Sequence, residues 1–228
     1  LLGHITINES YLFRGQQQMA TLAGTVIPRL MAERPSGRLR VWSAGCARGE
    51  EAATLAIVLA EALGLENSRW QILATDLDED SLAEARKGVF GARAVARVTP
   101  ELLKRYFTRA GNRFELASEL KERIGYRTLN LVTQSVPPPE APFDLVLLRN
   151  VLIYFRPAAQ RRVVETVANT LAPDGVVFVG PSESIWQLRS VLQPEDLGSC
   201  FCYRLGSRGP RTGGPGLEIG VGRGVVQA

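Results

Sequence analysis

The sequence has little of what metal sites and disulfides require. Its 228 residues include one histidine and three cysteines, Cys46, Cys200 and Cys202. The cysteines are odd in number and have no metal-ligand spacing, and the last two, which are two positions apart, are typical of one face of a strand. We therefore expect no metal site and a reduced, cytoplasmic protein.

Long apolar runs and a secretory signal are also missing. The most hydrophobic stretch, AATLAIVLA at 52–60, ends at Glu61, well short of the roughly 20 residues that span a bilayer. The N-terminus lacks the cationic, apolar and small-residue succession of a signal peptide. Hydrophobic residues make up 45% and charged residues 22%, which is typical of a globular protein with a buried core. We expect no integral membrane segment.

Apolar residues recur along the chain with helical and strand periods in alternation. Helices are expected at 10–33, with a kink or break at Pro28, and at 50–63, 79–87 and 157–171. Strands are expected at 39–43, 70–75, 124–131, 143–148, 175–180 and 200–205. Such alternation is typical of a parallel sheet. The expected fold class is therefore α/β, an open, mostly parallel, Rossmann-like sheet with helices on both faces.

The chain is expected to divide into three parts. An N-terminal helical segment at 1–36 precedes the main domain at 37–205, and a small β-rich insertion at about 88–123 interrupts that domain. Residues 206–228 contain eight glycines and two prolines, a composition that favours a tail or linker.

The net charge of +4 is concentrated around the insertion. From Arg86 to Arg127 there are eleven Lys or Arg and four Glu, a local charge of +7, so the remainder sums to −3. Within this block Thr99 and Pro100 are expected to open a short helix, and 112–127 reads as a basic hairpin. A concentrated basic block indicates an acidic partner, and a solvated surface is the alternative.

The loop after the first strand, Ser43–Gly49 in VWSAGCARGEE, lies where open α/β sheets bind ligands. It has neither the GK[ST] of a P-loop nor the GxGxxG of a dinucleotide-binding turn. Glu50 and Glu51 instead occupy the start of the next helix, where they would repel a phosphate. The acidic pair either complements the helix dipole or favours a ligand with positive charge.

Two further strand ends supply ligand-binding groups. Asp76 ends the second strand in ATDLDED, where an acid accepts hydrogen bonds from the hydroxyls of a ribose. A ribose without pyrophosphate, together with a cationic group, describes S-adenosylmethionine. The buried strand in FDLVLLRNVLIYF at 143–155 brings Arg149 and Asn150 to the same edge, with Tyr154 just beyond, and Phe155 is expected in the core.

These motifs together resemble the CheR-type chemotaxis-receptor glutamate O-methyltransferases, over residues 7 to about 205. The resemblance rests on six blocks in the family order: NESYLFR at 8–14, VWSAGCARGEE at 41–51, ATDLDEDSLAEARKGVF at 74–90, LNL at 129–131, FDLVLLRNVLIYF at 143–155 and LAPDGVVFVGPSES at 171–184. It implies an S-adenosylmethionine-dependent methyltransferase fold that esterifies glutamates of methyl-accepting chemotaxis-type receptors and yields S-adenosylhomocysteine.

The resemblance also implies roles for residues at matching positions. Arg14 and Tyr154 match the two residues near the transferred methyl group. Glu51 matches the acid that binds the methionine ammonium, and Asp76 the one that binds the ribose. The full set of implied cofactor-binding residues is Asn8, Ser10, Arg14, Gly45, Glu51, Asp76, Asn130, Leu131, Arg149 and Asn150.

The basic insertion matches the small β-subdomain that binds a receptor tail peptide in some members, so we expect the receptor to dock on Arg86–Arg127. One departure is that the sequence begins just before NESYLFR, whereas members usually have a helical docking domain before it. A trimmed chain and a different mode of docking are both open.

Other functions remain as alternatives. A nucleic-acid methyltransferase has support in the pI of 9.2, but RNVLIYF lacks the D/N-P-P-Y/F stretch that stacks a flipped adenine, and we expect no nucleic-acid partner. A non-catalytic S-adenosylmethionine-binding regulatory module and a small-molecule carboxyl methyltransferase would both keep this pocket. An NAD-dependent oxidoreductase is disfavoured because the phosphate-binding glycines are missing.

Overall fold

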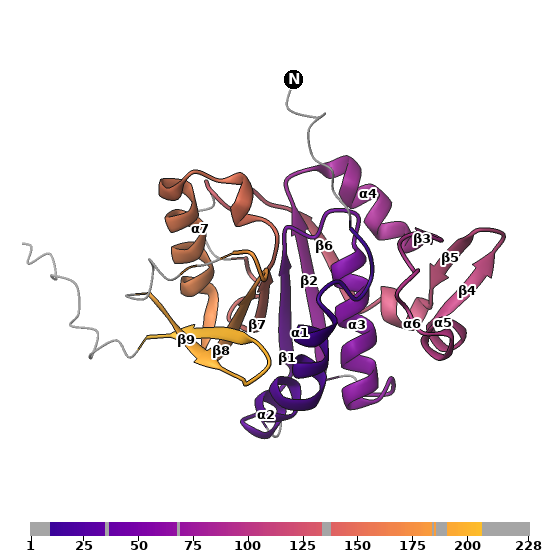
Figure 1. Ribbon diagram of the computed structural model, residues 1–228, viewed down its shortest axis with the longest axis horizontal. Coiled ribbons are helices and arrows are strands. Elements are labelled where there is room, and N and C mark those ends of the chain that lie inside the picture. Colours follow the sequence, from indigo (N-terminus) through magenta and orange to yellow (C-terminus); the bar gives the residue numbers. More distant parts are fainter. Residues whose placement is uncertain are drawn as a thin grey trace, which may run out of the picture.

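The computed structural model describes residues 10–34, 37–67, 69–133, 138–183, 185 and 191–206. The main sheet has seven strands in the order β6-β2-β1-β7-β8-β10-β9 (Figure 1). The strands are β1 Leu39–Ala44, β2 Trp70–Asp76, β6 Ile124–Thr128, β7 Phe143–Leu148, β8 Leu171–Val179, β9 Leu192–Asp196 and β10 Phe201–Leu205. The strands from β6 to β8 are parallel, and β10 is antiparallel to both its neighbours. The expected open, mostly parallel sheet is confirmed.

Two of the helices begin at a side-chain cap that the sequence provides. The helices are α1 Gln16–Thr21, the π-helical η1 Leu22–Val26, α2 Ile27–Ala32, α3 Glu50–Leu63, α4 Glu79–Lys87, α5 Pro100–Tyr106, α6 Ser118–Lys121, the 3-10 turn η2 Leu152–Tyr154 and α7 Pro157–Thr170. The Asp78 side chain accepts the Asp80 N–H at the start of α4, and Thr99 accepts the Leu102 N–H at the start of α5. Both bonds satisfy backbone donors that a first helical turn leaves unpaired. In the described part of the chain, no helix has the length and apolarity to cross a membrane.

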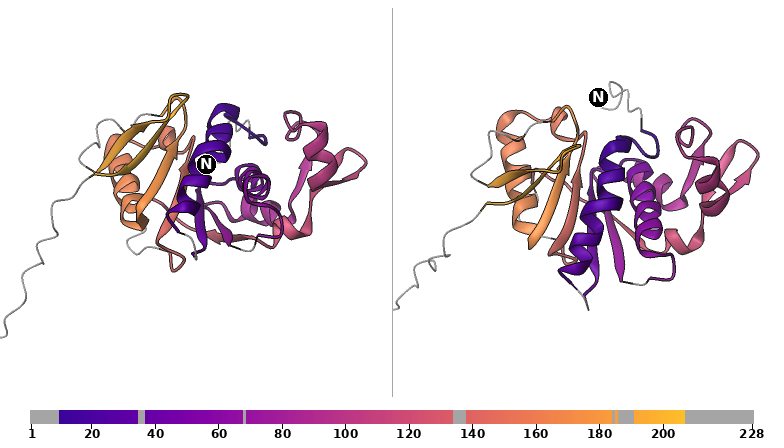
Figure 2. Two further views of the ribbon diagram at one scale, coloured as in Figure 1. Left: turned by 90° about the horizontal axis from the view of Figure 1, so that it is seen from below. Right: turned by 60° about the horizontal axis from the view of Figure 1, so that its bottom comes forward.

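Helices cover both faces of the main sheet, as expected (Figures 1 and 2). One face buries Val41, Ile72 and Leu145 together with residues of α3 and of the N-terminal helices. The opposite face buries Trp42 and Val146 with the apolar side of α7. Alternate residues of β1 and β7 therefore enter two separate cores, which is why both strands read as continuous hydrophobic runs.

The insertion forms a second sheet, in the order β3-β5-β4, with α5 and α6 beside it at the end of the molecule away from α7 (Figure 1). Its strands are β3 Val89–Gly91, β4 Phe107–Ala110 and β5 Arg113–Leu116, all antiparallel. A hairpin is present, but the expected limits of 112–127 are wrong. Its first strand is β4, and residues 124–128 instead pair with β2 at the edge of the main sheet.

The N-terminal helix begins at Gln16, not at residue 10 as expected. The preceding segment contains Phe13 and Gly15 with φ of 58° and 74°, which a right-handed helix does not allow. Tertiary hydrogen bonds hold that conformation, since the Leu12 N–H donates to the Ala94 carbonyl and the Phe13 N–H to Thr54 Oγ1. At Pro28, where a kink or break was expected, the backbone stays helical, and the π-helical η1 changes to α2 just before that proline.

Two other limits differ from expectation near the C-terminal end. β8 starts at Leu171 instead of 175, through an irregular register against β7, and shortens α7 by one residue. β9 was not expected, because LQPED contains a proline and two acids, but its pairing with β10 gives it strand geometry. The expected tail lies outside the described residues from 207 onward.

Candidate functional site

A cavity lies where the strand order changes direction, at the carboxyl ends of the parallel strands. β1 pairs in parallel with β2 on one side and with β7 on the other, which is the ligand-binding position in open α/β sheets. The cavity has a volume of about 470 Å³. Its lining includes nine of the ten expected cofactor-binding residues, namely Ser10, Arg14, Gly45, Glu51, Asp76, Asn130, Leu131, Arg149 and Asn150, and it also includes Tyr154.

The tenth expected cofactor-binding residue, Asn8, lies outside the described residues. The nine others all line the cavity.

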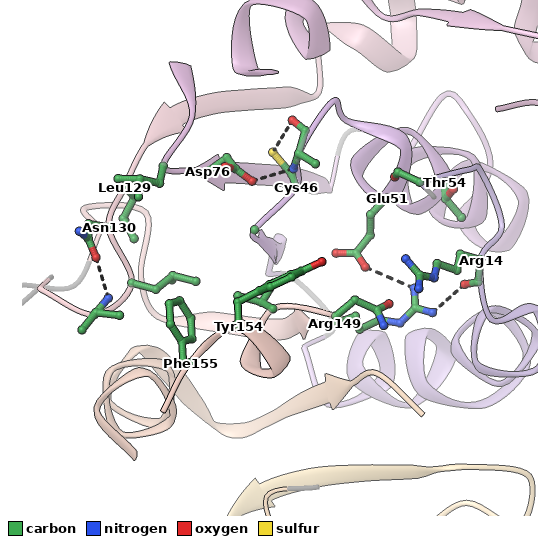
Figure 3. Close-up of a pocket in the computed structure, with 18 of the residues that line it drawn as sticks. Arg14, Cys46, Glu51, Thr54, Asp76, Leu129, Asn130, Arg149, Tyr154 and Phe155 are labelled. Carbon is green, nitrogen blue, oxygen red and sulfur yellow. Dashed lines mark hydrogen bonds and ion pairs between the residues drawn. The ribbon is translucent and has the colours of Figure 1, made fainter. Parts of the chain in front are cut away.

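The lining groups follow one another in a fixed order along the cavity (Figure 3). Leu129 and Asn130 lie at one end, and Glu51 and Arg149 lie at the other with Arg14 beside them. Asp76 lies between the two ends. The cavity therefore offers an amide and apolar end, a carboxylate in the middle, and an end that contains both signs of charge.

Asp76 projects from the end of β2 and is held by the neighbouring loops. Its Oδ2 accepts the Ala47 N–H at 2.8 Å, and its Oδ1 accepts the Asp78 N–H at 3.1 Å. A carboxylate has about four lone-pair positions. Each oxygen of Asp76 therefore retains acceptor capacity for a pair of ligand hydroxyls.

Asn130 and Leu131 follow β6 and form the amide and apolar end. The Asn130 side-chain oxygen accepts the N–H groups of Val132 and Thr133 at 3.0 and 3.3 Å. This fixes the amide so that its NH₂ group is the part left for a ligand. Leu129 and Leu131 are buried beside it. Phe155, which we expected only in the core, packs against that core and also lines the cavity.

The charged end contains a nearly buried ion pair. Arg149 Nη1 lies 3.3 Å from Glu51 Oε2, and the side chains are 3% and 17% exposed. Arg149 Nη2 donates to the Arg14 carbonyl at 2.7 Å, and Ser43 Oγ donates to Glu51 Oε1 at 2.7 Å. Arg149 therefore joins the start of α3 to the N-terminal segment. Burial raises the pKa of the Glu51 carboxyl, and Arg149 and Ser43 oppose that rise.

The N-terminal segment and the loop after β7 close the cavity from two sides. Arg14 and Tyr154 both line it, and the Tyr154 hydroxyl is directed toward the charged end (Figure 3). Tyr154 is 54% exposed, an unusual exposure for a large aromatic side chain. The exposed ring of Tyr154 at the cavity mouth is therefore accessible to a second molecule.

Ser10, in the N-terminal segment, contacts the start of α3. Its Oγ donates to Glu50 Oε2 at 2.9 Å, so Glu50 is directed toward the N-terminal segment.

Two glycines beside the cavity have positive φ and leave no room for a Cβ. Gly45 has a φ of 89°, and a Cβ there would lie 2.4 Å from Val151 Cγ2. Gly15 has a φ of 74°, and its Cβ would lie 2.4 Å from Arg149 Nη2. Gly45 was expected at the site from its motif, whereas Gly15 was not, although it directly follows NESYLFR.

Sequence reasoning missed two further groups near the cavity. Glu183 is buried and accepts backbone N–H groups from the loop that contains Asn150. Its signal was the acid in GPSES, one of the six motifs, to which we assigned no role. Cys46 lines the cavity, and burial, with Asp76 and Glu51 nearby, raises the pKa of its thiol well above its usual value. Cys46 therefore stays a thiol and is a poor nucleophile.

Comparison with known proteins confirms the resemblance stated from the motifs. The family model described as "CheR methyltransferase, SAM binding domain" matches residues 8–199. The chemotaxis protein methyltransferase of Escherichia coli is 34% identical over 191 residues, which cover 82% of this chain and 64% of that protein. That of Listeria innocua is 36% identical over 194 residues, 85% of this chain and 70% of that protein.

A third relative aligns with the whole chain. The probable biofilm formation methyltransferase WspC of Pseudomonas aeruginosa is 30% identical over 228 residues, 100% of this chain and 54% of that protein. The chain thus spans 64% of the Escherichia coli protein and about half of this third relative. The chain belongs to the CheR methyltransferase family and matches it over the S-adenosylmethionine-binding domain.

Proposed function

We propose that this chain transfers a methyl group from S-adenosylmethionine to glutamate side chains of chemotaxis-type receptors. The observation that carries the proposal is the order of groups along the cavity, with Asn130 at one end, Asp76 in the middle, and Glu51 with Arg14 at the other. Family membership supports the same ligand. A phosphate-containing dinucleotide would meet Glu50 and Glu51 where its phosphates normally bind.

The residues present fit S-adenosylmethionine. The NH₂ group of Asn130 suits the acceptor nitrogens of adenine, and the remaining acceptor positions of Asp76 suit the two ribose hydroxyls. The Glu51 carboxylate suits the methionine ammonium. The cavity of about 470 Å³ falls in the usual range for small-molecule sites.

Positioning is the main catalytic task of this site. When bound, S-adenosylmethionine supplies a methyl group on a sulfonium, and transfer to a carboxylate oxygen breaks the sulfur–carbon bond and cancels both charges. A glutamate with a pKa near 4.3 is already ionised at neutral pH, so the site needs no general base. Arg14 orients the incoming carboxylate, and Tyr154 limits its approach at the cavity mouth. The raised thiol pKa of Cys46 keeps that group from competing as a nucleophile.

Two substitutions of Tyr154 test whether its ring or its hydroxyl is needed for methyl transfer at the cavity mouth. If the ring shapes the approach of the receptor, Tyr154→Phe should retain most of the transfer rate, whereas Tyr154→Ala should lose about tenfold. The measurement is kcat/KM for the receptor, with Phe201→Ala as the control because Phe201 is equally exposed, on β10. Equal losses in Tyr154→Phe and Tyr154→Ala would assign the effect to the hydroxyl.

The raised pKa of Glu51 predicts how the affinity for S-adenosylmethionine depends on pH. Because its pKa is raised, Glu51 takes up a proton at a higher pH than an ordinary glutamate, and the protonated form no longer attracts an ammonium. The affinity for S-adenosylmethionine should therefore fall as the pH is lowered through that raised pKa. Calorimetric titrations from pH 7.5 to pH 5 should detect the fall in wild type and a much flatter profile in Glu51→Gln. Parallel profiles would contradict this role.

The receptor is proposed to dock through the basic block from Arg86 to Arg127. Part of its charge is neutralised internally, because Lys87, Arg105, Lys121 and Arg127 form ion pairs with Glu84, Glu61, Glu115 and Glu140. Arg86, Arg97, Lys104, Arg109 and Arg113 are exposed and have no ion pair within the described residues. These five cations favour an acidic partner.

The proposal is tested with methyl-labelled S-adenosylmethionine and an acidic receptor cytoplasmic fragment. We expect label on the fragment, no label when its acceptor glutamates are replaced by glutamine, and none on DNA. Raising the salt concentration should raise KM for the receptor more than KM for the cofactor if the basic block docks it. Label on DNA, or on a fragment without acceptor glutamates, would overturn the proposed acceptor.

A further inference from the structure

Glu183 is a buried carboxylate whose partners are backbone groups of the loop after β7. Its Oε2 accepts the Asn150 N–H at 2.6 Å and the Gly180 N–H at 2.7 Å. Its Oε1 accepts the Leu152 N–H at 2.7 Å and the Ile153 N–H at 3.4 Å. The side chain therefore joins the end of β8 to three N–H donors of one loop, and the residue is 8% exposed.

That loop carries side chains of the cofactor cavity. Asn150, Val151 and Tyr154 line the cavity. Glu183 accepts the N–H groups of Asn150 and Leu152, which lie on either side of Val151 in the sequence. Asn150 has a φ of 59°, a conformation that a non-glycine residue adopts only when its surroundings impose it. Two hydrogen bonds to a charged acceptor on either side of Val151 supply that constraint.

The end of β8 is shaped around the same carboxylate. A Cβ on Gly180 would lie 2.6 Å from Glu183 Oε2 and 3.1 Å from the Asn150 nitrogen. Any larger residue at position 180 would push Glu183 and the loop apart. The packing of Glu183 against the loop therefore requires glycine at position 180.

We propose that Glu183 is a positioning residue, which sets the loop at 150–154 in the conformation that binds S-adenosylmethionine. The inference rests on the proposed function for its ligand. It assigns a role to an acid that touches neither the cavity nor, in this arrangement, the reacting groups. Glu183 acts through the backbone of Asn150 and Leu152, and its loss affects cofactor binding before receptor binding.

The first test replaces Glu183 with glutamine and measures binding of S-adenosylhomocysteine by calorimetry. Glutamine has nearly the same shape, but its NH₂ group would face two N–H donors in place of an acceptor. We expect at least a tenfold loss of affinity, with faster amide hydrogen exchange at Asn150, Leu152 and Ile153 and unchanged exchange in β1. Glu165→Gln, exposed on α7, is the matched control.

A second variant keeps the test decisive if Glu183→Gln does not fold. Gly180→Ala should give the same loss of affinity and the same local exchange, whereas Gly24→Ala, with open space around it, should not. In the transfer assay, both site variants should raise KM for the cofactor and leave KM for the receptor within about twofold of wild type.

The outcomes separate this inference from the proposed function. Affinity within twofold of wild type, or an affinity loss with uniformly faster exchange across β1 and β7, would overturn the positioning role. If wild type binds S-adenosylhomocysteine but methylates no receptor, the proposed acceptor fails while the calorimetric and exchange results still decide the role of Glu183. If wild type does not bind S-adenosylhomocysteine, both fail.

Discussion

Replacing Arg14 with alanine should lower methyl transfer to a receptor by about 100-fold and leave S-adenosylhomocysteine affinity within about threefold of wild type. The side chain lines the cavity at the charged end, where an incoming carboxylate has to approach. Only the backbone carbonyl of Arg14 accepts the hydrogen bond from Arg149, and alanine retains that carbonyl. The substitution therefore removes the guanidinium and keeps the link between the N-terminal segment and β7.

The expected loss corresponds to about 2.7 kcal/mol of transition-state stabilisation. It is measured as kcat/KM for the receptor beside the calorimetric affinity for the cofactor product. Arg161→Ala, an exposed arginine on α7, should change neither quantity. Equal losses of transfer and affinity in Arg14→Ala would mean that the side chain holds the cofactor instead of the acceptor carboxylate.

Replacing Arg149 with methionine should be the most destabilising single change at the site. It leaves Glu51 nearly buried without its cation and removes the hydrogen bond to the Arg14 carbonyl. Breaking one partner of a buried pair costs about 3–5 kcal/mol. For a chain of this size the melting temperature should fall by roughly 6–20 °C. The low end is expected, because Glu51 retains some exposure and its raised pKa lets it take up a proton.

A double-mutant cycle isolates the pair. Arg149→Met combined with Glu51→Gln should recover part of the lost stability, because neither charge is then left without a partner. Cofactor affinity should stay low in the double variant, since the ammonium-binding carboxylate is gone. Thermal denaturation provides the stability measurement. A single variant that melts within about 2 °C of wild type would contradict a stabilising role for the ion pair.

The main fold could be predicted because its signals are local. Gly49 before Glu50 and Asp78 before Glu79 mark helix starts, and the structure places α3 and α4 at those residues. The continuous apolar run FDLVLL gives β7 with its limits as expected. In these segments the local preference of the sequence agrees with the tertiary structure, so tertiary contacts do not have to override it.

The segments that were predicted incorrectly depend on distant partners. Residues 10–15 were predicted to begin the N-terminal helix, but hydrogen bonds to Ala94 and Thr54 hold them in turns beside the cavity. β9 becomes a strand only through β10. No sequence pattern gives such pairings, because contacts between distant segments decide them.

The residues of the candidate site could be predicted from the sequence, but the hydrogen bonds that join them could not. The positions of Glu51, Asp76 and Arg149 in their motifs predict that all three lie at the same edge of the sheet. Arg149 donates hydrogen bonds to Glu51 and to the Arg14 carbonyl. These two bonds depend on the three-dimensional structure and could not be predicted from the sequence. Glu183 was missed because its ligands are backbone N–H groups, which have no side-chain signature in the sequence.

The chemical nature of the product tests the central claim most directly. After incubation with methyl-labelled S-adenosylmethionine, the labelled receptor fragment is treated with mild base and the volatile label is collected. A glutamate methyl ester hydrolyses under these conditions, so we predict that most of the label is released as methanol. Label that stays on the fragment through base treatment would mean methylation of nitrogen or another stable position, and would contradict a glutamate O-methyltransferase.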